Sequence, residues 1–401
     1  MKYDVAVIGA GIIGLSTSMD ILKRFPKCKL VVLEKEDLFS KHQTGRNSGV
    51  IHSGLYYKPN SLKAKNCIKG RELLIKFCEE ENIRYELCGK IVVATSKDQL
   101  NQLSFLQKRG KLNGLKGLKS LSKEEIRDYE PYCRGEGGIF VPQTGIVNYK
   151  EVSEKIIRKI NSLGGEIIYN SRVRGISQNM NNLVEIITQN TTILSKVLIT
   201  CGGVYSDRLA AMTENNLKFR ITPFRGEYFL LKKDAEKYVK NLIYPVPNIN
   251  FPFLGVHFTK MIDGSIECGP NAVLSFAREG YDKTSFNLRD TFDSLTWPGF
   301  FLLSQKYWKE GLNEFYRSIF KAEFVKELKK LVPNISSDDL IARESGIRAQ
   351  ACGINGELID DFYYFQNNNI VHICNAPSPA ATASLAISED ISRLIIDKIK
   401  I

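Results

Sequence analysis

The sequence lacks the features that mark several common classes of protein. It has no run of about 18 apolar residues that could span a membrane. Its nine cysteines are scattered and include no C-x-x-C pair, which argues against disulfides and zinc and favours a reducing compartment. P-loop, HExxH and nucleophile-elbow motifs are also missing. Only four histidines occur, so few side chains can act as bases near neutral pH.

The charge balance is strongly positive, with a net charge of +12 over 401 residues. Such a charge suits nucleic acid, an anionic membrane or anionic ligands. The densest basic stretch, from Gln107 to Lys123, contains no aromatic residue that could stack on bases. We therefore interpret it as a solvated face and expect no nucleic-acid partner.

The chain begins with the pattern of a dinucleotide-binding βαβ unit. A short β-branched run from Tyr3 to Ile8 predicts a buried strand, and a G-x-G-x-x-G motif follows from Gly9 to Gly14. A helical pattern then runs to about Arg24. Leu30 to Leu33 predicts a second strand, and Glu34 stands about 20 residues beyond the last glycine. This order of strand, glycine turn, helix and acid is the context that makes the motif specific.

Each of these residues has a physical role in holding a pyrophosphate and a ribose. Gly9 permits the tight turn, Gly11 lets the backbone approach the phosphates, and Gly14 lets the helix pack close to the sheet. The phosphates then face free N–H groups at the helix N-terminus. Glu34 can accept hydrogen bonds from a ribose diol, and its charge repels a 2′-phosphate.

A second glycine-rich segment, from His42 to Gly54, follows the second strand. It starts at the carboxyl edge of the predicted sheet, where open α/β sheets bind ligands. Its small residues let the backbone approach a flat ring, and Asn47 and Ser48 can hydrogen-bond a pyrophosphate or ring heteroatoms. Because no second G-x-G-x-x-G appears, we expect electrons to enter from an organic substrate and not from a nicotinamide.

The segment from His42 to Cys67 resembles the signature of the L-2-hydroxyglutarate oxidase/dehydrogenase family, which are FAD flavoproteins of the D-amino-acid-oxidase-like superfamily. Other blocks resemble the family in the same order along nearly the whole chain. They are Tyr132–Gly135, Thr144–Val147, Pro223–Tyr228, Phe251–Phe258, Gly269–Leu274, Gly346–Gln350 and Asn375–Thr382. Arg46, Ser345 and Ala383 depart from the usual family residues, but none of these departures removes a group assigned below to the chemistry.

The resemblance implies an α/β fold, in which a Rossmann-type FAD-binding domain is interleaved with an α+β substrate domain made of an antiparallel sheet and a helical cap. We expect residues 1–88, 145–215 and 343–401 to form the FAD-binding domain, and residues 89–144 and 216–342 the substrate domain. Phe219 to Leu231 and Met261 to Glu267 predict strands of the second sheet, with Asp263-Gly264 in a hairpin turn. We expect FAD as cofactor, held non-covalently, and no metal.

The cofactor-binding residues that we expect come from the βαβ unit, the loop after it, two later strands and the segment before the last helix. They are Gly9, Gly11, Ile12, Ile13, Gly14, Glu34, Lys35, Thr44, Gly45, Arg46, Asn47, Ser48, Gly49, Val173, Cys201, Gly202, Asn375, Ser378, Pro379 and Ala380.

Oxidation of an alcohol carbon beside a carboxylate needs a hydride acceptor, a base for the hydroxyl proton and cations for the carboxylates. Histidine is the base best suited to neutral pH. His42 lies at the start of the glycine-rich segment from His42 to Gly54, which we call the flavin loop. His372 lies in an apolar strand, where packing is the simpler interpretation. We expect both His52 and His257 in the active site, and the identity of the base stays open.

Arg348 is the third expected catalytic residue, because superfamily members take an arginine for the substrate acid from a Gly-x-Arg block at this place. A guanidinium binds a carboxylate through a two-point fork that lysine cannot form. A structural ion pair is the alternative. A dicarboxylate also needs a second anchor, for which the candidates are Arg225, Tyr57, Lys58 and Arg278.

The family resemblance predicts oxidation of L-2-hydroxyglutarate to 2-oxoglutarate by hydride transfer to FAD, with oxygen, a quinone or a carrier protein as electron acceptor. The alternatives are another small hydroxy acid, glycerol-3-phosphate or an amino acid on the same fold, and, less favoured, a nucleic-acid-modifying flavoprotein. We expect a cytoplasmic protein, or one bound peripherally to the inner membrane if the source is bacterial, because no cleavable targeting segment is visible before the first strand.

The segment from Thr291 to Lys330 predicts helices rich in aromatic residues. We expect most of these rings to pack into the core of the helical cap. The alternative is a face for a membrane surface or a partner, because an apolar stripe on a helix can also supply that. The aromatic residues of this segment include Trp297, Phe300, Phe301, Tyr307, Trp308, Phe315, Tyr316 and Phe320.

Overall fold

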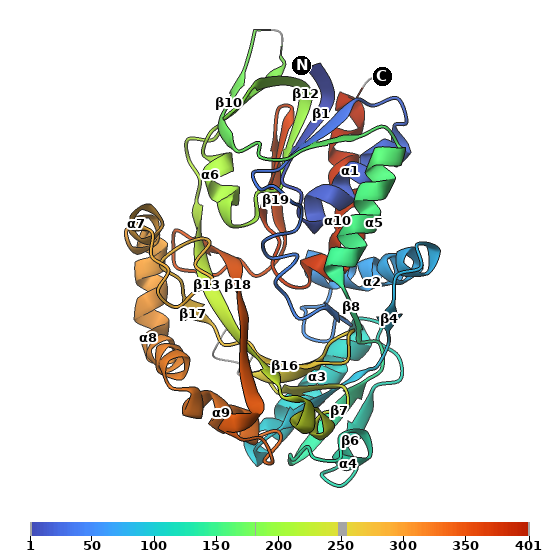
Figure 1. Ribbon diagram of the computed structural model, residues 1–401, viewed down its shortest axis with the longest axis vertical. Coiled ribbons are helices and arrows are strands. Elements are labelled where there is room, and N and C mark those ends of the chain that lie inside the picture. The colour runs from blue at the N-terminus through green and yellow to red at the C-terminus, as the bar shows by residue number, and fades with distance from the viewer. Residues whose placement is uncertain (1, 181, 248–254, 400–401) are drawn as a thin grey trace.

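The computed structural model describes residues 2–180, 182–247 and 255–399. Residues 251–254 of the family-like block Phe251–Phe258 therefore lie outside the described residues. The mixed α/β architecture is confirmed, with one large sheet in the upper half of the molecule and another in the lower half (Figure 1).

The upper sheet has the parallel centre of a dinucleotide-binding fold. Five of its strands run parallel, in the order β9 (Glu166–Ile168), β2 (Leu30–Leu33), β1 (Lys2–Ile8), β12 (Thr192–Thr200) and β20 (Ile370–Asn375). Antiparallel neighbours are β11 (Val184–Thr188), β10 (Val173–Gln178) and β19 (Tyr363–Asn367). β2 and the second half of β1, Val5 to Ile8, are apolar and buried on both faces, as parallel strands between covering layers require.

Four helices form the main layer against this sheet. They are α1 (Ile12–Arg24), α2 (Leu62–Glu80), α5 (Tyr149–Ser162) and α10 (Ala380–Ile395). One apolar cluster joins them to the strands and includes Val5, Leu15, Ile156 and Ile391, all fully buried. The last helix therefore packs against the first, which brings the two ends of the chain to one side of the molecule (Figure 1).

The lower sheet is mainly antiparallel. Its strand order is β17 (Val273–Leu274), β13 (Phe219–Leu231), β16 (Ile266–Gly269), β15 (His257–Lys260), β14 (Leu242–Pro245), β5 (Lys90–Ala94), β7 (Gly137–Val141) and β6 (Lys119–Leu121). β18 (Leu340–Gly353) pairs with β13 as well, and among the described strands of this sheet only β14 and β5 pair in parallel.

One predicted strand of this sheet is wrong in its bounds. The sequence pattern predicted a strand from Met261 to Glu267, whereas residues 261–265 form the turn that joins β15 to β16. The N–H of Met261 donates to the carbonyl of Ser265 at 2.8 Å, and Gly264 takes a positive φ at its centre. The hairpin at Asp263-Gly264 is therefore confirmed, and its turn is longer than the pattern indicated.

A third, small sheet and two further helices complete this part of the chain. The sheet consists of β3 (Val50–Ile51), β8 (Gly145–Val147) and β4 (Tyr85–Glu86), and the helices are α3 (Leu100–Leu112) and α4 (Ile126–Tyr129). Helix α6 (Ser206–Ala210) follows β12 and contacts β20.

Sheet membership bears on the domain division that the sequence suggested. β5 to β7 and β13 to β18 belong to the lower sheet, whereas β1, β2, β9 to β12, β19 and β20 belong to the upper one. Because β18 stays paired in the lower sheet as far as Gly353, we propose the last boundary near Gly353 and not at residue 343.

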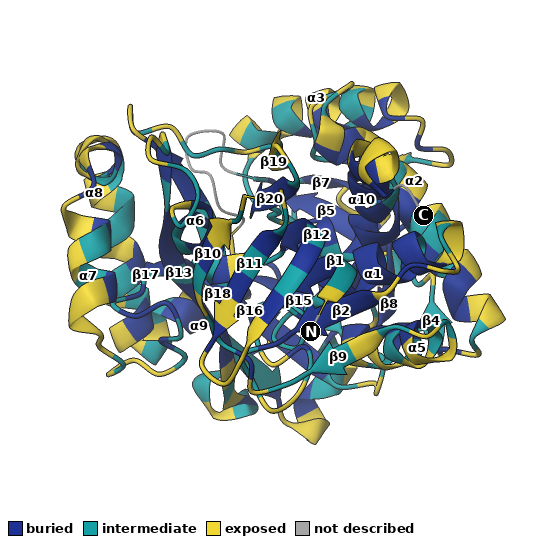
Figure 2. Cartoon of the chain, turned by 90° about the horizontal axis from the view of Figure 1, so that it is seen from above, coloured by how far each residue is buried: buried dark blue, intermediate teal, exposed yellow. Residues whose placement is uncertain are grey.

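The helical cap consists of α7 (Leu288–Leu295), α8 (Pro298–Ile319) and α9 (Lys321–Lys329), which lie along one side of the lower half (Figure 1). The expectation that most of its rings are buried is wrong. Trp297 is buried, but Phe301, Trp308, Tyr316 and Phe320 are each about half exposed or more. Figure 2 shows this exposed side of α7 and α8 at the edge of the molecule. Among the described helices, none is both long and apolar enough to cross a membrane.

Candidate active site

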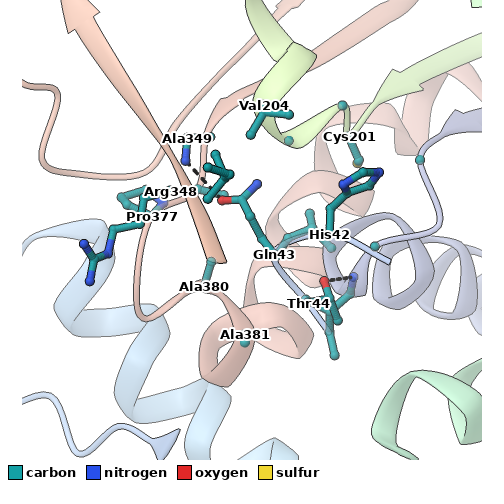
Figure 3. Close-up of a pocket in the computed structure, with 18 of the residues that line it drawn as sticks. His42, Gln43, Thr44, Cys201, Val204, Arg348, Ala349, Pro377, Ala380 and Ala381 are labelled. Atoms are coloured by element: carbon teal, nitrogen blue, oxygen red, sulfur yellow. Dashed lines mark hydrogen bonds between the residues drawn. The ribbon is translucent and has the colours of Figure 1, made fainter. Parts of the chain in front are cut away.

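A single large cavity of about 1000 Å³ lies between the two halves of the molecule. It extends from the turn between β1 and α1, past the loop of residues 40–48, to His52, His257 and Arg348. This volume is at the upper end of the roughly 300–1,000 Å³ that is usual for ligand sites. Figure 3 shows one part of it, where the Gln43 side chain points toward Ala349 of β18 and Thr44 points toward the start of α1.

The glycine turn after β1 forms one end of the cavity. Gly9 has φ +106°, and a Cβ there would lie 2.4 Å from the Cys201 carbonyl oxygen. A Cβ on Gly14 would lie 2.0 Å from the Gly9 carbonyl oxygen. Both positions therefore need glycine so that β1, α1 and β12 can pack. Gly11 differs, because a Cβ there would meet only Thr44 Oγ1 at 3.4 Å and would otherwise face open space.

The N-terminus of α1 opens toward this end. Gly11 is the N-cap residue and supplies no capping side chain, while the Ile12 N–H donates to Thr44 Oγ1 at 3.0 Å (Figure 3). Helix N-termini bind phosphate through N–H groups and the helix dipole. Ile12, Ile13 and Gly14 line the cavity, so the geometry suits a pyrophosphate.

Glu34 ends β2 beside the same turn and is buried. Its carboxylate accepts hydrogen bonds from the Ala10 N–H at 2.7 Å and from the Glu36 N–H at 3.0 Å. Each carboxylate oxygen keeps acceptor capacity beyond one such bond. The backbone therefore fixes the carboxylate in place on the cavity wall, where a ribose diol could also bind it.

The glycine-rich loop supplies both wall residues and internal supports. Thr44, Arg46, Asn47 and Ser48 line the cavity. The Asn47 amide also holds the loop itself, since it donates to the Thr44 carbonyl at 2.6 Å and accepts from the Gly49 N–H at 2.8 Å.

The two loop glycines are not on the cavity wall. A Cβ on Gly45 would lie 2.2 Å from the Ser40 carbonyl oxygen, and one on Gly49 would lie 2.6 Å from that of Val147. They let the loop pack tightly, so we assign them to its shape and not to direct contact with a cofactor.

The other expected cofactor residues also divide into two groups. Asn375 does not line the cavity, and its amide donates to the carbonyls of Ile359 at 2.7 Å and Asp361 at 2.9 Å, so it holds neighbouring backbone in place. The remaining residues all line the cavity: Lys35, Val173, Cys201, Gly202, Ser378, Pro379 and Ala380.

Lys35 lies in a cluster of charged side chains above the glycine turn. The side-chain atoms of Glu36, His42 and Glu279 lie close enough together to suggest a metal site. The Lys35 ammonium, however, contacts all three, at 2.5 Å from Glu279 and 2.9 Å from His42. The Lys35 ammonium already occupies the position that a metal ion would take. The cluster therefore links the flavin loop to the segment around Glu279 through ion pairs.

His52 and His257 meet at the other end of the cavity. Desolvation, together with a smaller effect of the Lys90 charge, lowers the pKa of His52 to about 3 and that of His257 to about 4. Both rings are therefore neutral at pH 7. The Nε2 atom of His52 lies 3.2 Å from Ser378 Oγ, where either atom can donate.

The tautomer of His257 follows from its neighbour. Its Nδ1 lies 2.9 Å from the Gly255 carbonyl oxygen, which can only accept. Nδ1 therefore carries the proton, and Nε2 carries the lone pair of the neutral ring. The ring packs 3.9 Å from that of Tyr244, centre to centre, which holds its plane. A fixed, neutral imidazole with a basic Nε2 is what a proton acceptor requires.

Arg348 lies in β18 and lines the cavity close to these histidines. Its Nη1 donates to the Asn271 carbonyl at 2.9 Å, which orients the guanidinium. Next to it, the Ala349 N–H donates to Gln43 Oε1 at 3.3 Å, so this part of β18 is tied to the flavin loop (Figure 3).

The four candidates for a second substrate anchor do not come together. Arg225 is buried in an ion pair with Glu227 at 2.9 Å, and Arg278 is buried in an ion pair with Asp207. Neither lines the cavity, and Lys58 is exposed outside it. Tyr57 does line it. We therefore propose no substrate contact for Arg225, Arg278 or Lys58.

Sequence reasoning missed several residues around the histidines. Tyr56, Lys63, Tyr228 and Tyr244 line the cavity. Lys90 lies behind them, 2% exposed, at the start of a strand that is otherwise apolar. A lone lysine at the head of a fully buried strand was the one signal that could have marked it.

The chain is similar to FAD-dependent oxidoreductases along nearly its whole length. The model of the DAO family, described as FAD-dependent oxidoreductase, matches residues 4–394. An L-2-hydroxyglutarate dehydrogenase of Indibacter alkaliphilus is 52% identical over 389 residues, which cover 96% of this chain and 97% of that protein. The proteins of that name from Escherichia coli strain K12 and from Homo sapiens, the latter mitochondrial, are 43% and 42% identical over 97% and 96% of this chain, and 92% and 87% of theirs.

Solved structures with the same fold include flavoenzymes. The dithionite-reduced L-α-glycerophosphate oxidase of Mycoplasma pneumoniae with FAD bound has a TM-score of 0.82 and 23% identity, covering 99% of this chain and 95% of its own. The glycine oxidase of Geobacillus kaustophilus has a TM-score of 0.76 and 15% identity, with the same coverage. At these identities the likeness concerns the fold alone.

Gly11→Val tests the assignment of the glycine turn to the pyrophosphate. Gly11 has an extended backbone, φ −81° and ψ 172°, which any residue adopts, and its Cβ position is open. We expect the variant to fold but to purify without stoichiometric FAD, because the side chain enters the space of the pyrophosphate. The ratio of flavin to protein absorbance and the circular dichroism spectrum measure the two effects.

Gly14→Ala is the matched control, since its Cβ would collide with the Gly9 carbonyl and not with a cofactor. It should lower the melting temperature even when the two variants are compared as apoproteins. Full FAD content in purified Gly11→Val would show that the turn does not hold the pyrophosphate.

Proposed function

The chain belongs to the L-2-hydroxyglutarate dehydrogenase family of FAD-dependent oxidoreductases, and we propose that its cavity oxidises L-2-hydroxyglutarate to 2-oxoglutarate. The observation that carries this function is 52% identity over 96% of the chain to a dehydrogenase of this name. Fold alone would not decide between hydroxy acids, glycerol-3-phosphate and amino acids. Identity over nearly the full length, together with a cavity that combines neutral histidines with an arginine, favours the 2-hydroxy acid.

The residues that line the cavity fit FAD. The glycine turn, the N-terminus of α1 and Glu34 would hold its pyrophosphate and ribose, and the segment of Ser378 to Ala380 lies near the histidines at the other end. When bound, FAD supplies the acceptor for the hydride from the substrate C2. The protein must then place C2 and remove the hydroxyl proton.

We assign the proton transfer to His257. Its Nδ1–H is held by the Gly255 carbonyl, so Nε2 is the free basic atom, and its depressed pKa of about 4 keeps it neutral at pH 7. His52 has a neighbour on its Nε2, the Ser378 hydroxyl at 3.2 Å, and we assign it to positioning beside the last cofactor segment.

We assign Arg348 to the carboxylate beside the reacting carbon. Its guanidinium is oriented by the Asn271 carbonyl through Nη1, which fixes the side chain before the substrate arrives. A bidentate contact from a preoriented arginine would fix both the position and the rotation of the carboxylate. The hydroxyl would then face the imidazole of His257.

His257→Asn tests the choice of base. An Asn amide can still donate to the Gly255 carbonyl, as Nδ1–H does, but it has no basic nitrogen. We expect flavin reduction by L-2-hydroxyglutarate in anaerobic stopped flow to slow by roughly 10²–10⁴-fold, the usual contribution of a general base, with normal FAD content. His52→Asn should slow it less. A larger loss in His52→Asn than in His257→Asn would exchange the two roles.

Arg348→Lys and Arg348→Ala test the carboxylate contact. Lysine keeps the charge but loses the fork, so even Arg348→Lys should lower kcat/KM by roughly 10- to 150-fold, as expected for a lost charged hydrogen bond of about 1.5–3 kcal/mol. FAD content should be unchanged in both. The measurement is flavin reduction by the L and D enantiomers and by lactate, with Lys58→Ala as the exposed control. Wild-type rates in Arg348→Ala, or equal reduction by lactate in the native enzyme, would contradict the assignment.

Electrons must leave the reduced cofactor for an acceptor, and we propose a quinone reached at a membrane surface. Support comes from the cap stripe, which we define as Phe301, Trp308, Leu312, Tyr316 and Ile319. Phe301 precedes the kink of α8 at Tyr307, the other four recur at helical spacing after it, and all five are 51–69% exposed. Several large apolar side chains exposed on one helix are typical of a contact surface.

The charges beside the cap stripe suit an anionic lipid surface. Lys306 and Lys309 flank it on α8, with ammonium groups 5.0 Å from the ring centre of Tyr307 and 5.5 Å from that of Trp308. Arg289 of α7 is exposed as well. Aromatic and aliphatic side chains with flanking lysines are typical of helices that lie in a membrane interface.

Trp308→Glu combined with Leu312→Glu tests the membrane contact. The native enzyme should sediment with vesicles of phosphatidylethanolamine and phosphatidylglycerol, more at low than at high salt, and the double variant should not. Activity with a water-soluble dye should be unchanged. Leu112→Glu, at another exposed leucine on α3, is the control. If the native enzyme is a dimer that the double variant dissociates, with no vesicle binding, the cap stripe joins two copies and the proposal fails.

A further inference from the structure

Lys90 is a buried cation for which the described part of the chain provides no anion. It is 2% exposed, and its ammonium lies 4.2 Å from the ring centre of Tyr56 and 4.9 Å from that of Tyr244. None of the ion pairs or hydrogen bonds of the described residues involves its side chain. The undescribed residues 248–254 contain no acid either.

Burial of an unpaired ammonium group is unfavourable in free energy. Moving an ammonium out of water without a partner costs several kcal/mol in typical proteins, and the group usually loses its proton instead. Burial lowers the pKa of Lys90 to about 7. The lysine is therefore close to half-protonated at neutral pH, and a nearby anion would decide its state.

The groups that face Lys90 from the surrounding elements are neutral or positive at pH 7. They are His52, Tyr56, Cys67 of α2, Tyr244 of β14 and His257 of β15. Burial raises the pKa of the Cys67 thiol to about 12, so it carries no charge. These described residues therefore include no anion that would stabilise the protonated form of Lys90.

The substrate can supply that anion. It carries two carboxylates, and Arg348 is assigned to one of them. Arg225 and Arg278 are used in internal ion pairs, and Lys63 pairs with Asp360 at 2.8 Å. Tyr56 and Tyr244 line the cavity with Lys90 behind them, and among the described residues the buried Tyr56 hydroxyl has no hydrogen-bond partner. An unpaired donor and a buried cation thus lie at one wall.

We propose, building on the function proposed above, that Lys90 is a positioning residue for the second carboxylate of the dicarboxylate, acting through the tyrosines that separate it from the cavity. A cation over a phenol ring strengthens the phenol as a hydrogen-bond donor. The Tyr244 hydroxyl already interacts with Thr259, so the unpartnered Tyr56 hydroxyl is the donor that would meet the carboxylate, and Lys90 provides the charge. A monocarboxylate such as lactate has no group to place at this wall.

The proposal has a consequence for pH. Below about pH 7 Lys90 is already protonated in the free enzyme, so a dianion binds without proton uptake. Above pH 7 the free enzyme has lost this proton, and binding of the dianion must restore it. Affinity for a dicarboxylate should therefore fall by up to about tenfold per pH unit above 7, with uptake of one proton.

The test uses the FAD-loaded enzyme with 2-oxoglutarate as dianion and pyruvate as monoanion. Binding is followed by the flavin spectrum from pH 6 to 9, and proton uptake by calorimetry at pH 8 in buffers of different ionisation heat. We expect uptake close to one proton for 2-oxoglutarate and none for pyruvate. Absence of uptake in the native enzyme overturns the proposal without any variant.

Lys90→Met retains the length of the side chain and removes the charge, with Lys58→Met as the exposed control. The variant should fold and melt no lower than the native enzyme, because it replaces an unpaired buried ammonium with an apolar side chain. It should bind 2-oxoglutarate at least tenfold more weakly at pH 6.5 and lose the pH dependence, while pyruvate binding changes little. Equal weakening for both acids would reduce Lys90 to a structural role.

Failure of the two proposals can be told apart. If L-2-hydroxyglutarate does not reduce the flavin of the native enzyme, the proposed function fails whatever Lys90 does. If it reduces the flavin normally and Lys90→Met retains the native pH dependence of 2-oxoglutarate binding, the function stands and the role of Lys90 fails.

Discussion

Strands β13 and β18 pair along almost their whole lengths, from Phe219 opposite Gly353 to Leu231 opposite Leu340. The register shifts between Gly226 and Tyr228, next to the point where Gly226 lies opposite Gly346. A Cβ on Gly346 would lie 2.6 Å from the Arg46 carbonyl oxygen. At this point the paired strands β13 and β18 therefore contact the flavin loop directly. The place of Arg348, two residues further on, depends on that contact. A change in the register by one residue would turn its side chain to the other face of the sheet.

Carboxylates and cations have different surroundings in the cavity. Its carboxylates are held by other groups: Glu34 accepts from two backbone N–H groups, and Asp360 pairs with Lys63. The cations near the two histidines include Arg348 on the wall and Lys90 behind it. An anionic substrate therefore meets positive potential at the catalytic end, while the histidines stay neutral because desolvation and the neighbouring cations both lower their pKa.

The parts of this arrangement that follow from local pattern could be read from the sequence. The strand, glycine turn, helix and Glu34 lie within one stretch of chain, and their spacing defines their geometry. The ion pair of Arg225 is local, because Glu227 lies two residues further along the same strand. That of Arg278 could not be read, since its partner Asp207 lies 71 residues away along the chain and meets it only through the fold. The cap aromatics show the same limit. Helical spacing reveals a stripe but not whether another part of the chain covers it, and here Trp308 is left exposed.

Lys90 affects the pKa of the histidines differently in the empty site and in the occupied site. Its charge lowers the pKa of both histidines, which keeps a base neutral but also makes it a weaker proton acceptor. A substrate carboxylate at the Tyr56 wall would offset that charge. The pKa of His257 would then rise, since a nearby negative charge favours the protonated imidazole, while desolvation, the largest cause of its low pKa, would still keep the ring neutral. A dicarboxylate with its second carboxylate at the Tyr56 wall would thus leave the base stronger than a monoanion bound only at Arg348.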